Sequence, residues 1–188
     1  MTAPTTRLAA PERRRELVEA ALRVFSQGSY AGATTAEIAR EAGVSEPILY
    51  RHFDSKRSLY IACLDEAWAR IRTRIEEKIA DLGPTEGWLA IGPATLREMR
   101  VLVPSLWMQA ITEAGEDPDI RRHVRAHMRE VHDFFADVVR RAQAEGTVRP
   151  DRDPDAEAWI FVSGTLLYAI ADRLGGPLRG EDFDAVKA

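Results

Sequence analysis

Apolar residues recur at spacings of three and four positions along nearly the whole chain, and this periodicity restricts the fold more than any other feature. Such spacing places one apolar stripe on a helix, as in the run Leu64, Trp68, Ile71, Ile75 and Ile79. No stretch shows the sustained apolar–polar alternation with β-branched residues that is expected of strands. The sequence therefore predicts an all-α protein.

Capping residues and helix breakers set the predicted helix bounds. Thr34 and Glu37 have the spacing of a capping box, in which each side chain bonds the backbone amide of the other residue. Asp-Pro-Asp sequences that begin at Asp117 and Asp153 each supply a cap and a first-turn proline. The predicted helices cover residues 11–27, 35–42, 46–52, 55–80, 101–114, 118–145 and 154–173, with short or kinked pieces over 85–100.

The composition is that of an ordinary globular protein. Of 188 residues, 45% are apolar and 30% are charged, which excludes disordered and fibrous classes. The single cysteine, Cys63, excludes an intrachain disulfide and a cysteine-cluster zinc site, and we expect it in the core. No apolar run reaches the roughly 18 to 20 residues that span a bilayer, and the N-terminus lacks the apolar stretch of a signal peptide. We therefore expect a cytoplasmic protein without membrane contact.

Charge is divided unevenly along the chain. The formal net charge is −4, but residues 1–60 contain nine Lys and Arg against seven Asp and Glu. Residues 61–188 contain 17 Lys and Arg against 23 Asp and Glu. Because only the contacting module of a DNA-binding protein needs to be basic, the first third is the only candidate for a surface that faces phosphate.

The two short helices meet at the turn Ala42-Gly43-Val44-Ser45, which is the arrangement of a helix-turn-helix. Gly43 supplies the left-handed backbone that so tight a turn requires, and Ser45 is placed to cap the second helix. The apolar residues at the junction are Ile38, Ala39, Val44, Ile48 and Leu49. Since any helical bundle contains such corners, this pattern alone leaves DNA binding and simple bundle packing as alternatives.

The segment from Thr34 to Tyr60 resembles the DNA-binding module of the TetR family of repressors. The hallmark of that family is a very short recognition helix that ends in Leu-Tyr-x-His and a bulky apolar residue, and here the sequence reads Leu49-Tyr50-Arg51-His52-Phe53. The match covers roughly residues 11–60, and the rest of the chain shows only a compatible helix layout. The resemblance implies a three-helix DNA-binding domain over 11–71, with its helix-turn-helix motif at 34–53, and a helical effector-binding and dimerisation domain over 72–188.

The resemblance also implies roles for single residues. The residues expected to bind phosphate are Thr34, Thr35, Tyr50, His52 and Lys56. Those expected to read base edges are Glu46, Pro47, Ile48 and Arg51. Ser45 completes the set of residues expected to contact DNA. The chain departs from many members at Ala36, where they have a basic residue, and at Glu46 and Ile48, where they have polar ones. We expect Phe53 to pack the module. In the alternative interpretation, Tyr50 and His52 also pack it, Glu46 is only an anion at a helix N-terminus, and Lys56 and Arg57 form a solvated face.

Dimerisation is the second implication of the resemblance. One short helix in the major groove reaches few base pairs, so a two-fold dimer on a palindromic operator is expected. In the family the last two long helices, here 118–145 and 154–173, pair with those of a second copy. The predicted interface contains Val131, Phe135, Val138, Trp159, Val162, Gly164 and Leu166. Ordinary packing within one chain is the alternative for these residues.

A ligand cavity is the third implication. The helices expected to surround it carry aromatic and methionine side chains with one amide, which suit a mostly apolar small molecule. The predicted pocket residues are Trp68, Trp88, Met99, Trp107, Met108 and Gln109. For any one of them, a plain core position is the alternative.

Two histidines and a glutamate on one predicted helix have a spacing that can bind a metal ion. His123, His127 and Glu130 lie three and four positions apart, so they share one stripe of a helix, and such spacing can bind a metal. Because the surrounding sequence is strongly charged, a solvated helix face is the preferred interpretation. We expect no metal site and no cofactor.

The sequence predicts a DNA-binding transcriptional regulator, most simply a repressor that binds its operator as a dimer and is released by a small-molecule effector. It leaves open whether the ligand releases the protein from DNA or promotes binding. An enzyme would need a nucleophile–base pair or a carboxylate pair in a cleft, and the sequence shows no such motif, so we expect no catalysis. A helical dimeric adaptor that does not bind DNA and a metal-responsive regulator are the remaining alternatives.

Overall fold

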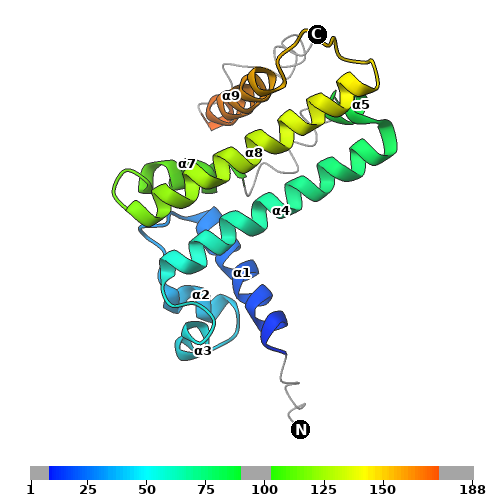
Figure 1. The fold of residues 1–188 in the computed structure, drawn as a ribbon. Helices are drawn as coiled ribbons and strands as arrows, with labels where there is room; N and C mark the ends of the chain where they lie inside the picture. The colour runs from blue at the N-terminus through cyan, green and yellow to red at the C-terminus, as the bar shows by residue number, and fades with distance from the viewer. Residues whose placement is uncertain (1–8, 90–102, 174–188) are drawn as a thin grey trace. The chain divides into compact units, whose positions relative to one another are not determined.

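The computed structural model describes residues 9–89 and 103–173, and all regular structure in these residues is helical. The helices are α1 (Ala10–Gln27), α2 (Thr35–Glu41), α3 (Glu46–Tyr50), α4 (Lys56–Leu82), α5 (Pro84–Leu89), α7 (Val103–Glu113), α8 (Pro118–Ala144) and α9 (Pro154–Arg173) (Figure 1). The predicted all-α class is therefore confirmed. No described helix combines the length and the apolarity needed to cross a membrane.

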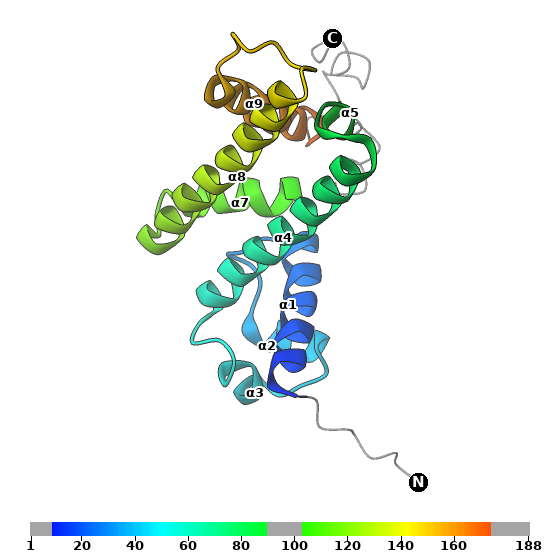
Figure 2. The ribbon, with the colours of Figure 1, turned by 45° about the vertical axis from the view of Figure 1, so that its right-hand side comes forward.

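The chain divides into two compact units, residues 1–67 and 68–188. The division falls within α4, in the same helix as the predicted domain boundary between residues 71 and 72. In the first unit α1 packs against α2, and α2 packs against α3 (Figure 2).

The core of the first unit is built on aromatic rings. Phe25 is fully buried and meets the ring of Tyr60 edge to face, with 5.0 Å between the ring centroids. Cys63 is also buried, and its thiol contacts the Val18 carbonyl oxygen at 3.8 Å. Burial raises the pKa of this thiol, so it stays protonated and behaves as a small apolar side chain. Its predicted core position is confirmed.

Local sequence signals fix the ends of α2. The Thr34 hydroxyl oxygen accepts from the Glu37 amide at 3.1 Å, and the Glu37 carboxylate accepts from the Thr34 amide at 2.9 Å, so the predicted capping box is confirmed. The same backbone hydrogen bond lowers the pKa of Glu37. Gly43 follows with φ at +67°, the left-handed conformation that the sequence predicted for this turn. Ser45 stands at the N-cap of α3, but its side chain makes no capping hydrogen bond.

In the second unit α8 packs between α9 and the C-terminal part of α4 (Figure 1). The Asp117 carboxylate caps α8 by accepting from the amides of Asp119 and Ile120, as its Asp-Pro-Asp sequence predicted. The buried residues of this core are Trp68, Ile71, Ile75, Ile79, Phe134, Phe135, Ala136, Val138 and Ala158. The apolar stripe predicted along α4 is thus its buried face.

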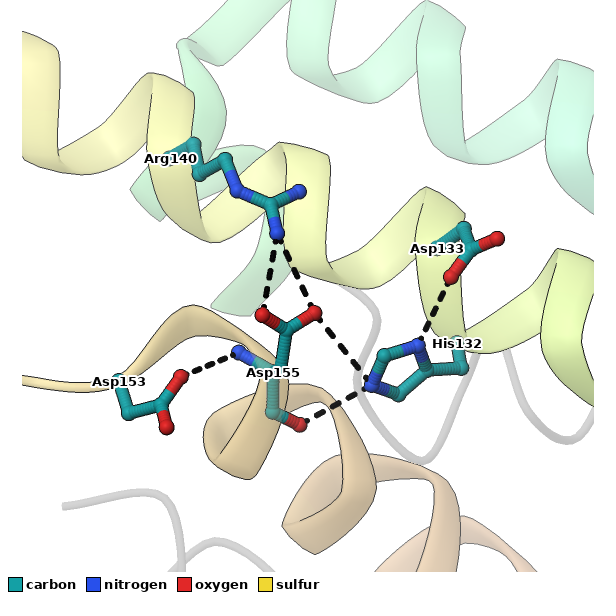
Figure 3. Close-up of polar contacts among 5 residues, drawn as sticks. All are labelled: His132, Asp133, Arg140, Asp153 and Asp155. Atoms are coloured by element: carbon teal, nitrogen blue, oxygen red, sulfur yellow. Dashed lines mark hydrogen bonds and ion pairs between the residues drawn. The ribbon is translucent and has the colours of Figure 1, made fainter.

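A polar cluster joins α8 to the first turn of α9 (Figure 3). The buried ring of His132 places Nδ1 3.0 Å from Asp133 Oδ1 and Nε2 3.1 Å from the carbonyl oxygen of Asp155. Arg140 donates to both carboxylate oxygens of Asp155 at 3.2 Å. The Trp159 ring stacks on His132 with 4.5 Å between centroids. This cluster holds the start of α9 against the middle of α8.

Candidate nucleic-acid interface

The predicted DNA-contacting residues lie around the short helix α3, and most of them are accessible. Exposed members are Thr34, Ser45, Pro47, Tyr50 and Arg51, and half-buried members are Glu46, Ile48, His52 and Lys56. Only Leu49 of α3 is buried, and it joins the module's core. The other four residues of α3 are exposed or half-buried.

Thr35 differs from the rest of the set because it is buried, with 9% of its surface exposed. Its hydroxyl donates to the carboxylate of Glu46 and lies 3.1 Å from the hydroxyl of Tyr50. These contacts link the first turn of α2 to both ends of α3. Sequence reasoning missed them, because the partners lie 11 and 15 positions away and no local pattern relates them.

Lys56 has partners inside the module. Its ammonium donates to the carbonyl oxygens of Tyr30 at 2.8 Å and Ala33 at 3.1 Å, and it lies 4.5 Å from the centroid of the Tyr30 ring. The side chain therefore holds the loop between α1 and α2 against the start of α4. The predicted role in phosphate binding does not account for these contacts, which span more than 20 residues of sequence.

Tyr50 and Phe53 differ in exposure. Phe53 is 3% exposed, and the Arg14 guanidinium lies 4.5 Å from the centroid of its ring, so Phe53 packs the module as expected. Tyr50, in contrast, is 47% exposed. Its ring remains available to a partner, although its hydroxyl is close to Thr35.

In the second unit, four rings form an aromatic cluster that consists of Trp68, Trp107, His127 and Phe134. The His127 ring lies 4.5 Å from Trp107 and 5.7 Å from Trp68, and Phe134 lies 5.6 Å from Trp68. The Trp68 indole N–H donates to the carboxylate of Glu130 at 3.0 Å. The structure thus brings two of the six predicted pocket residues, Trp68 and Trp107, to one histidine.

The other four predicted pocket residues make no ring contact that the structure describes in this cluster. Met108 and Gln109 are half-buried on α7, beside Trp107. Met99 lies outside the described residues, as does the side chain of Trp88. Of the six predicted pocket residues, only Trp68 and Trp107 have ring contacts described in the cluster.

The solvated face predicted for the α8 histidines is wrong for His127, which is only 4% exposed. The stripe borders the apolar face, and rings from α4 and α7 cover His127. Glu130 turns to Trp68 and lies 3.7 Å from Arg72. Among the described residues no three His, Cys, Asp or Glu side chains are placed together to hold a metal.

The predicted dimer residues separate into two groups. Phe135 and Val138 are 5% and 1% exposed within one chain, and Val131 packs against the same core, which supports the intrachain alternative for these three.

The predicted dimer residues on α9 are more accessible. Trp159 is 46% exposed, and Val162, Gly164 and Leu166 are half-buried on the same helix. Two further apolar residues of α9, Ile160 and Leu167, are 59% and 55% exposed and were not predicted.

Comparison with known families decides what this module is. Residues 17–63 match the family model for bacterial regulatory proteins of the tetR family, and residues 89–186 match the model for the tetracyclin repressor-like C-terminal domain. The chain belongs to the TetR family. The first match covers α2, the turn and α3 of this TetR-family protein, and the second covers α7, α8 and α9.

Curated relatives match parts of this TetR-family chain. The HTH-type transcriptional activator FasR of Mycolicibacterium smegmatis is 52% identical over 58 residues, which are 31% of this chain and 26% of FasR. The HTH-type transcriptional regulator BetI of Brucella canis is 29% identical over 125 residues, which are 65% of this chain and 63% of BetI. The chain therefore spans less than two thirds of the length of either relative.

Solved structures of low sequence identity share the fold. A TetR-family transcriptional regulator from Rhodococcus sp. aligns with a TM-score of 0.78 at 22% identity, over 94% of this chain and 95% of that one. A transcriptional regulator from Saccharomonospora viridis in complex with choline aligns with a TM-score of 0.70 at 22% identity, over 94% of each chain. At such identities the likeness establishes the fold alone.

Proposed function

We propose that this protein is a sequence-specific DNA-binding transcriptional regulator that reads a palindromic operator as a homodimer. The observation that carries the proposal is the helix-turn-helix of α2 and α3, in which a capped helix and a left-handed Gly43 present the side chains of a five-residue helix. The excess of positive charge in residues 1–60 supports a phosphate-facing role for this unit.

The homodimer is supported by α9. Trp159, Ile160 and Leu167 are large apolar side chains that one chain leaves about half exposed. Ile160 and Leu167 lie seven positions apart and so share one face of α9, and large exposed apolar faces typically mark an interface. A second copy that pairs through α9 would bury it and would supply the second recognition helix that a palindrome requires.

Selection from a library of random duplexes tests the DNA-binding function. We expect enrichment of an inverted repeat whose half-site centres lie about 34–36 Å apart or a multiple of that distance, because two symmetric helices enter successive major grooves. The affinity for the selected site should fall steeply with salt. A protein that enriches no duplex, while remaining folded and dimeric, would be the adaptor instead.

We further propose that the protein acts as a repressor and that a ligand releases it from the operator. The relative FasR is named an activator, so the direction of regulation needs its own test. A reporter gene placed behind the selected operator should be silenced by the protein and restored by the ligand. A reporter that is raised by the protein would make it an activator.

The ligand is proposed to bind against the aromatic cluster. Indole, imidazole and phenyl faces suit a mostly apolar molecule, and aromatic faces also attract a quaternary ammonium. A structural neighbour was solved with choline, which makes choline a suitable first probe.

Replacing Trp107 by alanine is expected to weaken choline binding by about tenfold, since it removes one ring that faces a cation. Operator affinity should change less than twofold, because Trp107 lies outside residues 1–67. Titration of tryptophan fluorescence measures the first quantity. Trp159→Phe is the matched control, because Trp159 stacks on His132 rather than in the cluster. Equal choline affinity in Trp107→Ala and the wild type would exclude Trp107 from the site.

A further inference from the structure

Three hydroxyl and carboxylate groups of the DNA-binding module form a chain of hydrogen bonds between α2 and α3. The hydroxyl of Thr35 lies at the centre, bonded to the Glu46 carboxylate on one side and 3.1 Å from the Tyr50 hydroxyl on the other. Thr35 is buried, whereas Glu46 is half-buried and Tyr50 is exposed. This series of hydrogen bonds therefore starts at Glu46 on α3, passes through the buried Thr35 on α2, and returns to α3 at Tyr50.

The number of hydroxyl protons determines which group donates in each of these hydrogen bonds. An ionised carboxylate only accepts hydrogen bonds, so the single hydroxyl proton of Thr35 goes to Glu46. The Thr35 oxygen is then an acceptor toward Tyr50, and the Tyr50 hydroxyl donates its own proton to Thr35. The order of donation is Tyr50 to Thr35 to Glu46.

This direction changes what each residue offers to DNA. Phosphate oxygens only accept hydrogen bonds, and the one hydroxyl proton of Tyr50 is already donated inward, so Tyr50 does not donate to phosphate while the chain of bonds is intact. The hydroxyl of Thr35 is likewise committed to Glu46. Glu46 retains acceptor capacity at the first turn of α3, where side chains of a recognition helix contact base edges.

We propose that Glu46 determines base specificity and that Thr35 and Tyr50 are positioning residues that orient its carboxylate. This inference rests on the proposed DNA-binding function. A carboxylate accepts from the exocyclic amine of cytosine, so cytosine is the base that Glu46 favours at one position of each half-site. A glutamate held by Thr35 keeps one orientation, whereas a free glutamate side chain samples several rotamers and discriminates less.

Binding-site selection with the full-length protein tests the inference. Glu46→Gln is expected to relax the preference for cytosine toward adenine at one position per half-site, because an amide pairs with adenine. Thr35→Val keeps the shape of Thr35 but removes its hydroxyl, and Tyr50→Phe removes the outer donor. Both should weaken the cytosine preference at that same position by about three- to tenfold, the range of one hydrogen bond, and leave the other positions unchanged.

Two controls separate positioning from folding and from phosphate binding. Thr35→Ser retains the hydroxyl and should restore the wild-type preference, which a purely structural defect of Thr35→Val would not explain. Tyr50→Phe should leave the dependence of affinity on salt unchanged, whereas loss of a phosphate contact would lower affinity equally on all sequences.

The outcomes distinguish this inference from the proposed function. If the wild type selects an operator and Thr35→Val selects it with the same base weights, or loses affinity uniformly, the positioning role is wrong although the protein binds DNA. If the wild type selects no duplex, both the inference and the proposed function are overturned.

Discussion

Replacing Ile160 and Leu167 together by glutamate is expected to convert the protein to a monomer. The two side chains are 59% and 55% exposed in one chain, and they lie seven positions apart on α9, which places them on one face of the helix. In a single chain, charges at these positions remain in water and should change the free energy of unfolding by less than about 0.5 kcal/mol. In a dimer they would be buried without partners, which is strongly destabilising.

The loss of the dimer should also lower operator affinity by about a hundredfold or more, because the second half-site no longer binds as part of the same complex. Sedimentation at micromolar concentration measures the first effect, and binding to the selected duplex measures the second. Ile111→Glu is the matched control, since Ile111 is 42% exposed on α7 and should leave the dimer intact. A double variant that remains a dimer would show that the exposed face of α9 is not the interface.

Lys56→Met is expected to lower the free energy of unfolding of the DNA-binding unit by about 2 kcal/mol, because hydrogen bonds from a charged donor contribute about that much. The substitution keeps most of the aliphatic stem but removes the ammonium that bonds the carbonyls of Tyr30 and Ala33. Urea unfolding without DNA measures this loss.

A charge control is available one residue along the chain. Arg57→Met removes the same charge from the first turn of α4 but leaves the two Lys56 bonds in place, so it should cost less than about 1 kcal/mol. Phosphate binding is measured separately, since losing one phosphate contact lowers the salt slope by about 0.9. If Lys56→Met lowered the salt slope but not the stability, Lys56 would act on DNA alone.

The bounds of the helices could be predicted closely because the signals that set them are local. The Thr34–Glu37 capping box, the left-handed Gly43 and the cap at Asp117 each depend on residues within three positions, and all three are as predicted. Helix α3 is shorter than predicted, at 46–50 instead of 46–52, since its last turn tightens at Arg51, whose amide donates to the carbonyl of Ile48.

The contacts that define the candidate site could not be predicted, because they join distant parts of the sequence. Nothing near Lys56 indicates that Tyr30 and Ala33 are its acceptors, and nothing near Thr35 indicates Glu46. The burial of His127 was missed for a related reason. Periodicity identifies the apolar face of α8, but it does not indicate that Trp107 of α7 covers the edge of that face.

The shortness of α3 limits how much information it can extract from DNA. Its five residues rise about 7.5 Å, which matches about two base-pair steps of roughly 3.4 Å. Two such helices specify about four to six base pairs, and since each pair has four possible identities, they distinguish between a few hundred and a few thousand sequences. A genome offers at least about a million competing sites. For the proposed regulator, most of the remaining discrimination must therefore come from the spacing of the half-sites and from how readily the uncontacted base pairs between them deform.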